Sequence, residues 1–339
     1  MAKVLALSAH DIASVLTMSD AVTAVEEAYA QKAQGKGLAW PMVYHAFNPS
    51  VADMDIRSGE LVDNGLFGLK LTAWFSENPS RGLPEIFGTT LLCDDTTGAP
   101  LALVNASAVT GLRTGAAGAL GIKWLGRKDA SRLLVAGTGH QATYQVAAAL
   151  AANPGINHVE VWDPRKAEAP VARVEQMKAT VADMLAAAQV KKDYEIVAVS
   201  DGEAAVRSAD AIITITPATT PFIKADWVQP GVHISAVGAD MEGKQEVESG
   251  VAAHALVFAD DRPQSISAGE LELPYKEGVL AEDAITEIGE VIVNAKPGRT
   301  SDDPITLFDT SGIAVQDLAA TKIAYDRAVE AGVGTYVEL

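Results

Sequence analysis

The stretch that most constrains the fold is RLLVAGTGHQATYQVAAALAA, residues 132–152, in which a short apolar segment leads through two glycines into an alanine-rich run. The apolar segment predicts a buried strand, and the alanine-rich run predicts a helix. Gly137 and Gly139 permit a tight turn without Cβ atoms, and the N–H groups at the helix start point into that turn. Ala142 takes the third position of the pattern G-x-G-x-x-G/A, where a small side chain lets the helix lie close to the strand. The stretch therefore predicts a turn that binds phosphate.

A glycine pair alone is a weak signal, because it also occurs in turns that bind nothing. The next apolar strand ends in Asp163, where a dinucleotide-binding unit places an acid that accepts hydrogen bonds from the adenosine ribose. Alternatively, Asp163 only begins a loop with Pro164. The order of strand, glycines, helix, strand and acid favours the dinucleotide. A carboxylate there repels a 2′-phosphate, which predicts NAD, although Arg165 and Lys166 directly behind it leave NADP possible.

The length and composition of the chain indicate a globular protein with two domains. It has 339 residues, 48% of them hydrophobic, and no uninterrupted apolar run approaches the roughly 20 residues of a membrane span. His10 and Asp11 stand where a signal peptide needs an apolar stretch, so we expect a cytoplasmic protein. The single Cys93 excludes an internal disulfide, and the sequence has no zinc-ligand spacing. A formal charge of −18 argues against binding to nucleic acid or to an anionic membrane.

Alternating strand and helix patterns dominate the middle of the chain and predict an α/β fold with a Rossmann-type, doubly wound parallel sheet over residues 119–304. The six predicted strands are RLLVA, HVEVWD, YEIVAVS, DAIITIT, VHISAVG and ALVFAD. A helix rich in alanine and glycine, SAVTGLRTGAAGALGIKWLG, leads into this region.

The chain ends predict a second, discontinuous α+β domain formed by residues 1–118 with 305–339. An amphipathic helix capped near Ser19 ends at Gly35 and Gly37. FGLKLTAWF, GTTLLCD and PLALVNA read as antiparallel strands separated by hairpin turns. The tail carries one more strand and a long amphipathic helix, and its simplest placement is on this domain.

Three charged residues are candidates for chemistry. Asp240 directly follows the fifth strand, at the strand end where ligands of doubly wound sheets bind, and a carboxylate beside a dinucleotide can accept a proton. A helix N-cap or a solvated loop acid is the alternative for Asp240. Lys70 interrupts an apolar strand, and Arg113 interrupts a helix of small residues that permit close approach of a ligand or another backbone. Taken singly, both are more often exposed; an arginine in this setting can bind a carboxylate or a phosphate.

Several motifs together resemble the ornithine cyclodeaminase/mu-crystallin family. In chain order they are GLK (68–70), TGLRTGAAGAL (110–120), GTGHQA (137–142), AVGAD with GKQE (236–246), and LFDTSGIAVQDL (307–318). The resemblance covers most of the chain. It implies a homodimer, a substrate-binding and dimerisation domain built from both chain ends, and a Rossmann domain that binds a nicotinamide cofactor.

The resemblance also implies roles for individual residues. Asp240 would be the catalytic acid/base, and Lys70 would contact the substrate carboxylate. Around the cofactor it implies Arg113 near the phosphate, Gly137 and Gly139 in the turn, His140 and Gln141 along the pyrophosphate, Asp163 at the ribose, Thr216 and Val237 near the cofactor, Lys244 as a further contact, and Thr310 and Ser311 on the nicotinamide side, with Ser311 also a candidate substrate contact.

Two departures from the family pattern fall on the substrate side. Relatives carry an arginine for the substrate carboxylate upstream of the lysine, but this chain has no arginine before Arg57. We take Arg57 as the replacement, with an exposed hairpin arginine as the alternative, and Tyr44 and His45 of WPMVYHAF as further candidates. Where relatives place a threonine in the strand after the lysine, the chain is predicted to have Glu85.

These residues predict an NAD-dependent oxidoreductase that acts on the carbon–nitrogen bond of a small amino or imino acid. Three alternatives remain: a cyclodeaminase-type lyase that reduces and reoxidises NAD within one turnover, an opine-type condensing dehydrogenase, and a non-enzymatic ligand-binding protein like the crystallin members. The presence of Lys70 and Asp240 argues against the last of these.

Overall fold

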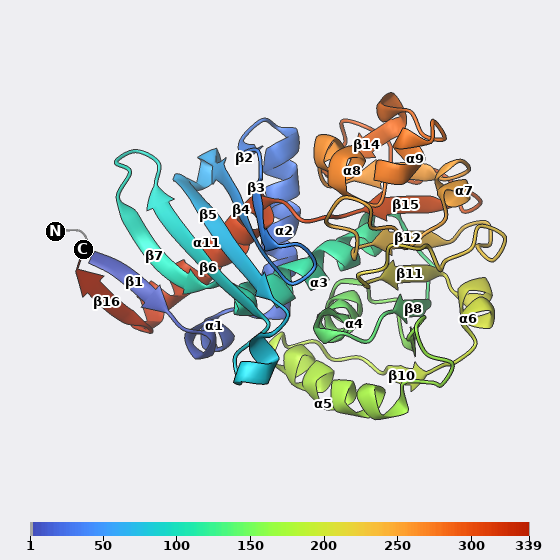
Figure 1. The fold of residues 1–339 in the computed structure, drawn as a ribbon, viewed down its shortest axis with the longest axis horizontal. Coiled ribbons are helices and arrows are strands. Elements are labelled where there is room, and N and C mark those ends of the chain that lie inside the picture. Colours follow the sequence, from blue (N-terminus) through green and yellow to red (C-terminus); the bar gives the residue numbers. More distant parts are fainter. Residues whose placement is uncertain (1–2, 339) are drawn as a thin grey trace. The chain divides into compact units, whose positions relative to one another are not determined.

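The computed structural model describes residues 3–338, and the chain divides into two compact units (Figure 1). Unit 1 comprises the residues up to Arg113 together with those from Ile313 onward, and unit 2 is Thr114–Gly312. Both changes of unit differ by a few residues from the predicted limits. At the second change, segment 305–312 lies in unit 2, whereas the sequence assigns it to the domain formed by the chain ends.

Unit 1 contains an eight-stranded sheet with the order β16-β1-β7-β6-β5-β4-β2, on which β3 pairs with β4. Strands β4 to β7 form consecutive antiparallel hairpins, and β1 joins β7 in parallel. The predicted antiparallel strands are therefore present. The strand bounds are β1 Lys3–Leu7, β2 Gly37–Ala39, β3 Val43–Asn48, β4 Ala52–Leu61, β5 Leu66–Phe75, β6 Ile86–Asp94, β7 Pro100–Asn105 and β16 Thr335–Glu338.

Four helices belong wholly or partly to unit 1: α1 (Ala9–Val15), α2 (Met18–Ala33), α11 (Ala314–Ala331) and the start of α3 (Ala106–Leu125). The cap predicted near Ser19 lies two residues earlier, at Thr17, after which α2 begins. Thr17 and Asp20 form a reciprocal capping box, each side chain accepting from the other's backbone N–H. Ser19 has Val22 three residues on and cannot form such a pair.

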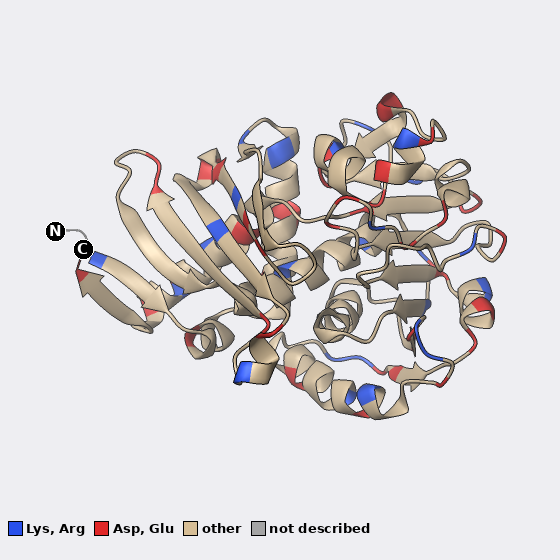
Figure 2. Cartoon of the chain, viewed as in Figure 1, with Lys and Arg blue, Asp and Glu red and all other residues tan. Residues whose placement is uncertain are grey.

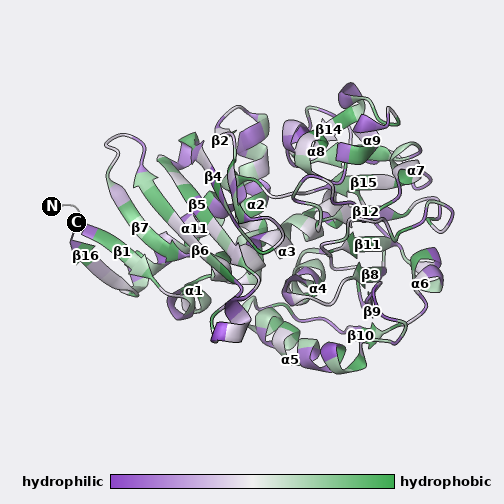
Figure 3. Cartoon of the chain, viewed as in Figure 1, coloured by the Kyte–Doolittle hydropathy of each residue, from purple (hydrophilic) through white to green (hydrophobic). Residues whose placement is uncertain are grey.

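Helix α11 packs against one face of this sheet, and exposed apolar residues such as Leu71 and Leu103 lie on the other. Figure 3 shows green, hydrophobic segments along its strands. Strand register places Arg57, Lys70 and Thr90 directly opposite one another across β4, β5 and β6. Gly68, on the same side of β5 as Lys70, lets α11 approach, since a Cβ at Gly68 would lie 2.8 Å from Leu318 Cδ2. The row that contains Lys70 therefore faces α11.

Unit 2 is built on an eight-stranded sheet with the order β10-β9-β8-β11-β12-β15-β13-β14, in which all pairs are parallel. The predicted α/β class and doubly wound sheet are confirmed. The strand bounds are β8 Arg132–Ala136, β9 His158–Trp162, β10 Glu195–Ala198, β11 Ala211–Thr214, β12 His233–Ala236, β13 Leu256–Ala259, β14 Ile285–Glu287 and β15 Thr306–Asp309.

The prediction that the tail strand joins the domain of the chain ends is wrong. Strand β15 lies between β12 and β13 in the sheet of unit 2. All four of its residues, TLFD, are buried, as expected for a central parallel strand that is covered on both faces. Only α11 and β16, which follow it, return to unit 1.

The helices of unit 2 after α3 are α4 His140–Ala152, α5 Val171–Ala187, α6 Gly202–Ser208, α7 Ser249–Ala252, α8 Arg262–Ala268, α9 Glu272–Lys276 and α10 Ile288–Ile292. The small residues of α3 admit another helix, because a Cβ at Gly115 would lie 2.5 Å from the carbonyl oxygen of Tyr144 in α4. Within residues 3–338, no helix is long and apolar enough to cross a membrane.

Candidate active site

Three buried basic side chains meet one buried acid in unit 1 (Figure 2 shows blue segments on β4 and β5). Arg57 and Lys70 are 8% and 4% exposed and stand opposite each other on neighbouring strands. Lys70 Nζ lies 3.1 Å from Oδ1 and 3.0 Å from Oδ2 of Asp317 on α11. Arg113 Nε donates to Oδ1 of the same carboxylate at 3.0 Å. The alternatives in which these three basic residues are exposed are therefore wrong.

The charges of this cluster shift the pKa values of its members. Burial lowers the pKa of Lys70 to about 8; the nearby Arg113 adds to the effect, and Asp317 partly offsets it. Burial opposes ionisation of Asp317, but Arg113 and Lys70 outweigh it and lower the pKa of that carboxyl. Arg57 Nε also lies 3.3 Å from Oδ1 of Asp55. Three buried cations gathered beside one another form a site suited to a carboxylate, such as that of an amino acid.

Thr90 completes the row of Arg57 and Lys70. Its side chain is fully buried, and its hydroxyl has no hydrogen-bond partner among the described residues. Glu85, predicted at the position of the relatives' threonine, precedes β6 and accepts a hydrogen bond from Trp74 Nε1 at 2.8 Å. Thr90 directly faces Lys70 in the strand after it.

Tyr44 and His45 lie on β3, one strand further from Lys70 than Arg57. The Tyr44 side chain is exposed, and its hydroxyl donates to Asp53 Oδ2 at 3.4 Å. The His45 ring contacts Phe47 edge to face. Of the three candidates for the missing carboxylate contact, only Arg57 stands directly beside Lys70.

The glycine turn of unit 2 contains one glycine that the fold requires and one that it does not. Gly137 has φ +133°, and a Cβ there would lie 2.4 Å from the carbonyl oxygen of Ile215. Gly139 caps α4 with φ −69°, and a Cβ there would meet no protein atom within 4 Å. The open space at Gly139, in front of the N–H groups of α4, fits the close approach of a dinucleotide pyrophosphate.

The first turn of α4 carries His140 and Gln141, as predicted for residues along the pyrophosphate. A residue that the sequence did not single out, Arg173 of α5, also holds this turn. Its guanidinium donates to the carbonyl oxygens of Thr138 and Gly139 at 3.0 and 3.1 Å. No local pattern signals this role, because Arg173 is one of several charged residues on an amphipathic helix.

Asp163 follows β9 and is fully buried. Its Oδ2 accepts from the Thr138 hydroxyl at 2.7 Å, and its Oδ1 accepts from the backbone and Nε of Arg165 at 3.1 and 3.2 Å. Burial opposes ionisation, but these hydrogen bonds outweigh it, and the pKa of Asp163 is about 2. Asp163 is therefore an ionised acceptor beside the glycine turn, as a ribose-binding acid must be.

Residues that follow β11, β12 and β15 meet at the carboxyl edge of the sheet. The backbone N–H of Val237 donates to Thr214, and that of Thr310 donates to Ala236, both at 3.0 Å. The Thr310 hydroxyl donates to Asp260 Oδ2 at 2.9 Å, and Ser311 Oγ accepts from Gln264 Nε2 at 2.9 Å. Val237, Thr310 and Ser311 thus share one edge with the glycine turn, as the resemblance implies.

Glu246 links several residues at this edge of the sheet by hydrogen bonds. It was not among the predicted site residues. Its carboxylate accepts from the Thr216 backbone and hydroxyl at 2.6 and 2.7 Å, from the Thr214 hydroxyl at 2.7 Å and from Gly238 N at 2.8 Å. It is buried beside Glu270. The sequence around Glu246 does not indicate these contacts, because they depend on how the loop folds against the ends of the neighbouring strands.

Asp240 lies in the loop between β12 and Glu246, not at a helix N-terminus. Its side chain is 43% exposed, and Lys244 Nζ lies 2.5 Å from its Oδ1. The two residues predicted as acid/base and cofactor contact therefore form an ion pair within one loop. In residues 3–338, no group of three or more His, Cys, Asp or Glu residues could hold a metal ion.

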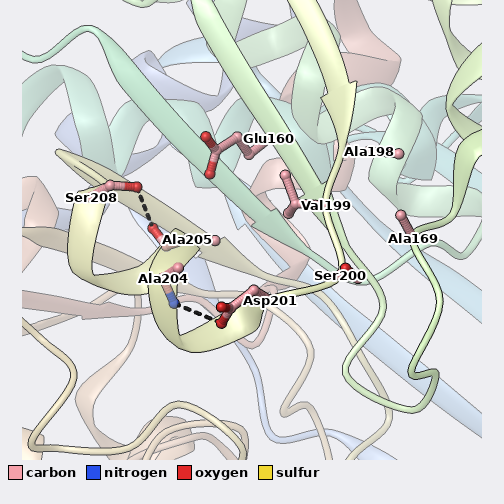
Figure 4. A pocket seen from close by; sticks show the side chains of 9 residues that line it. All are labelled: Glu160, Ala169, Ala198, Val199, Ser200, Asp201, Ala204, Ala205 and Ser208. Carbon is pink, nitrogen blue, oxygen red and sulfur yellow. Dashed lines mark hydrogen bonds between the residues drawn. The ribbon is translucent and has the colours of Figure 1, made fainter.

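A surface hollow of about 380 Å³ lies elsewhere in unit 2, over β10 and the start of α6 (Figure 4). None of the predicted site residues lines it. Its acidic groups already have partners, because Glu160 accepts from Arg132 at 2.6 Å and Asp201 caps α6. We assign no function to this hollow.

A Rossmann-type unit with an open phosphate turn and an α+β unit with a buried cationic row define a dinucleotide-binding protein of two units. Comparison with known proteins narrows this class. The chain belongs to the ornithine cyclodeaminase/mu-crystallin family, whose model matches residues 2–332.

Three solved structures of relatives are similar to the whole chain. An archaeal alanine dehydrogenase dimer with bound NAD shares 34% identity over 99% of both chains, with a TM-score of 0.86. The Δ1-pyrroline-2-carboxylate reductase of Thermococcus litoralis, in complex with NADH and L-proline, shares 30% identity over 98% of this chain and 100% of that one (TM-score 0.88). The iminosuccinate reductase of Paracoccus denitrificans, in complex with NAD+, shares 30% identity over 99% and 100% (TM-score 0.87).

Proposed function

We propose that this protein is an NAD-dependent oxidoreductase that acts on the carbon–nitrogen bond of a small amino or imino acid. The observation that carries the proposal is the buried pair of Arg57 and Lys70, which stand opposite each other on neighbouring strands. Such a pair binds a carboxylate strongly, because water does not compete for the charges. The names of the three relatives, which describe reactions of amino and imino acids, support the same substrate class.

Unit 2 is the proposed cofactor-binding unit. The turn at Gly137 and Gly139 would hold the pyrophosphate, with His140 and Gln141 along it, and Asp163 would accept from the ribose hydroxyls. When bound, the nicotinamide supplies or takes up the hydride. Because Asp163 is ionised and faces Arg165, we propose that NAD is preferred over NADP.

Side chains of the protein would bind the substrate and transfer the proton. Arg57 and Lys70 orient the substrate by its carboxylate, and Thr90 contributes an unpaired hydroxyl beside them. Asp240 exchanges the proton of the substrate nitrogen, and Lys244 stabilises its carboxylate form. Arg113, which the resemblance implied near a phosphate, is held instead by Asp317 and Gln316, and we assign it to the carboxylate cluster.

The proposed assembly is a homodimer formed through the exposed face of the unit 1 sheet. Val43, Leu71, Phe87 and Leu103 are exposed apolar residues on the face away from Lys70. A contiguous apolar sheet face of this kind is typical of a protein interface. The archaeal alanine dehydrogenase, a dimer, supports a second copy of this chain as the partner.

A substrate screen tests the proposal. Amino acids with NAD, and keto acids with ammonia or cyclic imino acids with NADH, are mixed with the protein while nicotinamide absorbance is followed. We expect net oxidation of NADH with an imino acid and much weaker turnover with NADPH. Ammonia release without net NADH would instead indicate a cyclodeaminase-type lyase, and a strict need for an amine together with a keto acid would indicate an opine-type enzyme. Cofactor binding with no turnover across the panel would contradict an enzymatic function.

A further inference from the structure

Asp317 is 1% exposed and contacts two buried basic side chains, Lys70 and Arg113. It bridges Lys70 and Arg113 with N–O distances of 3.0–3.1 Å. The preceding residue, Gln316, also holds Arg113 in place. Its Oε1 accepts from Arg113 at 2.8 Å, and its Nε2 donates to the Tyr29 hydroxyl at 2.6 Å. Helix α11 therefore fixes Arg113 at two points and Lys70 at one.

The charges around Lys70 make the acid necessary. Arg57 faces the ammonium from β4, Arg113 from α3 and Asp317 from α11, while β6 contributes only the uncharged Thr90. Burial and both guanidinium groups disfavour a charged lysine, and the Asp317 carboxylate favours it. Without Asp317, the ammonium would keep both guanidinium groups as neighbours, and the described contacts of Lys70 include no other carboxylate. The remaining acid of the cluster, Asp55, contacts Arg57.

We propose that Asp317 is a positioning residue of the carboxylate site, which keeps Lys70 charged and holds its ammonium and the Arg113 guanidinium in place to receive a substrate carboxylate. The inference rests on the proposed function only for the identity of that ligand. Asp317 is 1% exposed, its Oδ1 accepts from both Lys70 and Arg113, and its Oδ2 lies 3.0 Å from Lys70 Nζ, so we assign it the positioning of these cations and not a contact with the substrate.

A dependence on pH follows from this arrangement. The pKa of Lys70 is about 8, so its ammonium persists at neutral pH and is lost as the pH rises through that value. Replacing Asp317 by asparagine removes the neighbouring carboxylate, which raises the pKa of Lys70. Carboxylate binding should then begin to fail at a lower pH.

The direct test is the titration of Lys70, followed by the ¹³C shift of its ε-carbon in lysine-labelled full-length protein and assigned by its disappearance in Lys70→Arg. We expect a midpoint near 8 in the wild type and a midpoint at least about one pH unit lower in Asp317→Asn, since a lost opposite charge shifts a pKa by roughly 1–3 units. Thr321→Val is the matched control: it alters a buried polar side chain of the same helix whose hydroxyl has no partner among the described residues. It should leave the midpoint unchanged.

Kinetics supply the second readout. At neutral pH, Asp317→Asn should raise KM for the imino acid roughly ten- to a hundredfold, and the alkaline limb of kcat/KM should move to lower pH with that of the Lys70 titration. If Asp317→Asn does not fold, Asp317→Glu is used. Its extra methylene displaces the carboxylate, so it should also lower the midpoint and raise KM.

An unchanged Lys70 midpoint in the folded Asp317 variant would overturn the inference, as would an equal shift in Thr321→Val. The titration requires no turnover. A lowered midpoint in a protein that turns over no substrate would support the role of Asp317 and contradict the proposed function alone.

Discussion

At the scale of single residues, the surroundings of Lys70 reverse what its sequence context suggests. A lysine in an apolar strand usually extends its ammonium to water. Lys70 is buried instead, because its ammonium has a charged partner in Asp317. The two residues are 247 positions apart in the chain, but Lys70 Nζ lies 3.1 Å from Asp317 Oδ1. The sequence predicted Lys70 because it interrupts an apolar strand, Asp240 because it follows the fifth strand, and Arg57 as the replacement for an arginine of the family pattern. It could not predict Asp317, since an acid within an amphipathic helix is normally solvated, and only the fold brings it beneath two cations.

Removing either cation tests the carboxylate site. Lys70→Met and Arg57→Met should each raise KM for the imino acid roughly ten- to a hundredfold, because a charge-assisted hydrogen bond from a buried site is worth ~1.5–3 kcal/mol. Lys70→Met should also lower kcat, since Lys70 orients the reacting carbon. Cofactor affinity, measured by fluorescence titration with NADH, should barely change.

Tyr44→Phe is the matched control for these variants, because Tyr44 is exposed on the strand beyond Arg57. It should leave KM unchanged. If Arg57→Met kept normal substrate saturation and Tyr44→Phe did not, the contact with the substrate carboxylate would have to be assigned to Tyr44 on β3.

The proposed acid/base can be separated from its partner. Asp240→Asn keeps the shape of the side chain, and its amide oxygen can still accept from Lys244, but it cannot take up the proton. Turnover should fall by roughly 10²–10⁴-fold, with NADH affinity retained. Lys244→Met, which removes the partner alone, should lose far less activity. Near-normal turnover in Asp240→Asn would remove Asp240 from the chemistry.

At the scale of elements, local patterns predicted most helices and strands, and failures occurred where distant contacts decide. The strands β5 to β13 and helices α2, α3, α4 and α11 follow from their periodicity. The sheet that β15 joins does not follow from its sequence, because a four-residue strand with two apolar side chains fits either sheet, and pairing with β12 and β13 is a property of the whole fold. The same limit hid Glu246, whose four hydrogen bonds close the loop that carries Asp240.

Stability should depend on pH through this closure. Burial raises the pKa of Glu246 to about 7 from an ordinary value of 4.5, and burial with the charge of Glu246 raises that of Glu270. A raised carboxyl pKa stabilises the folded state fully below pH 4.5, and that contribution is lost as the pH rises through about 7. The melting temperature should therefore fall between about pH 5 and pH 7.

Glu246→Gln tests this account by thermal unfolding across the same pH range. The pH dependence should flatten, because one titrating group is removed and the pKa of Glu270 falls. The variant should also lose about 1–3 kcal/mol, since its amide nitrogen cannot accept from Gly238 N–H. Glu277→Gln, at an exposed position, should change neither property. An unaltered pH profile in Glu246→Gln would show that other groups cause the dependence.

At the scale of the whole molecule, the sequence was sufficient for the fold class, because the glycine turn and the alternation of strands and helices admit few topologies. It was not sufficient for the face of the unit 1 sheet that lies away from α11. Apolar residues that point to both faces of a strand indicate that both faces are covered, but they do not identify what covers each face. Leu71 and Leu103 remain exposed on this face, and the proposed second copy of the chain would cover them.

A charge placed on that face should disrupt the dimer. Leu103→Glu would bury two carboxylates in a symmetric interface, and we expect a shift from dimer to monomer by size-exclusion chromatography with light scattering. Val171→Glu makes the same change at an exposed apolar residue of unit 2 and should leave the mass unchanged. A monomeric wild-type protein, or a Leu103→Glu variant that remains dimeric, would contradict the assignment of this face.

The central claim is hydride transfer to the carbon of a carbon–nitrogen double bond, and isotope transfer tests it most directly. The protein is supplied with NADH deuterated at the transferable position of the nicotinamide and with the imino acid that gives the fastest turnover, and the amino acid product is analysed by mass spectrometry and NMR. The account predicts one deuterium on the α-carbon and one NAD+ formed per product. A product without deuterium, or ammonia release with no net change in NADH, would contradict it.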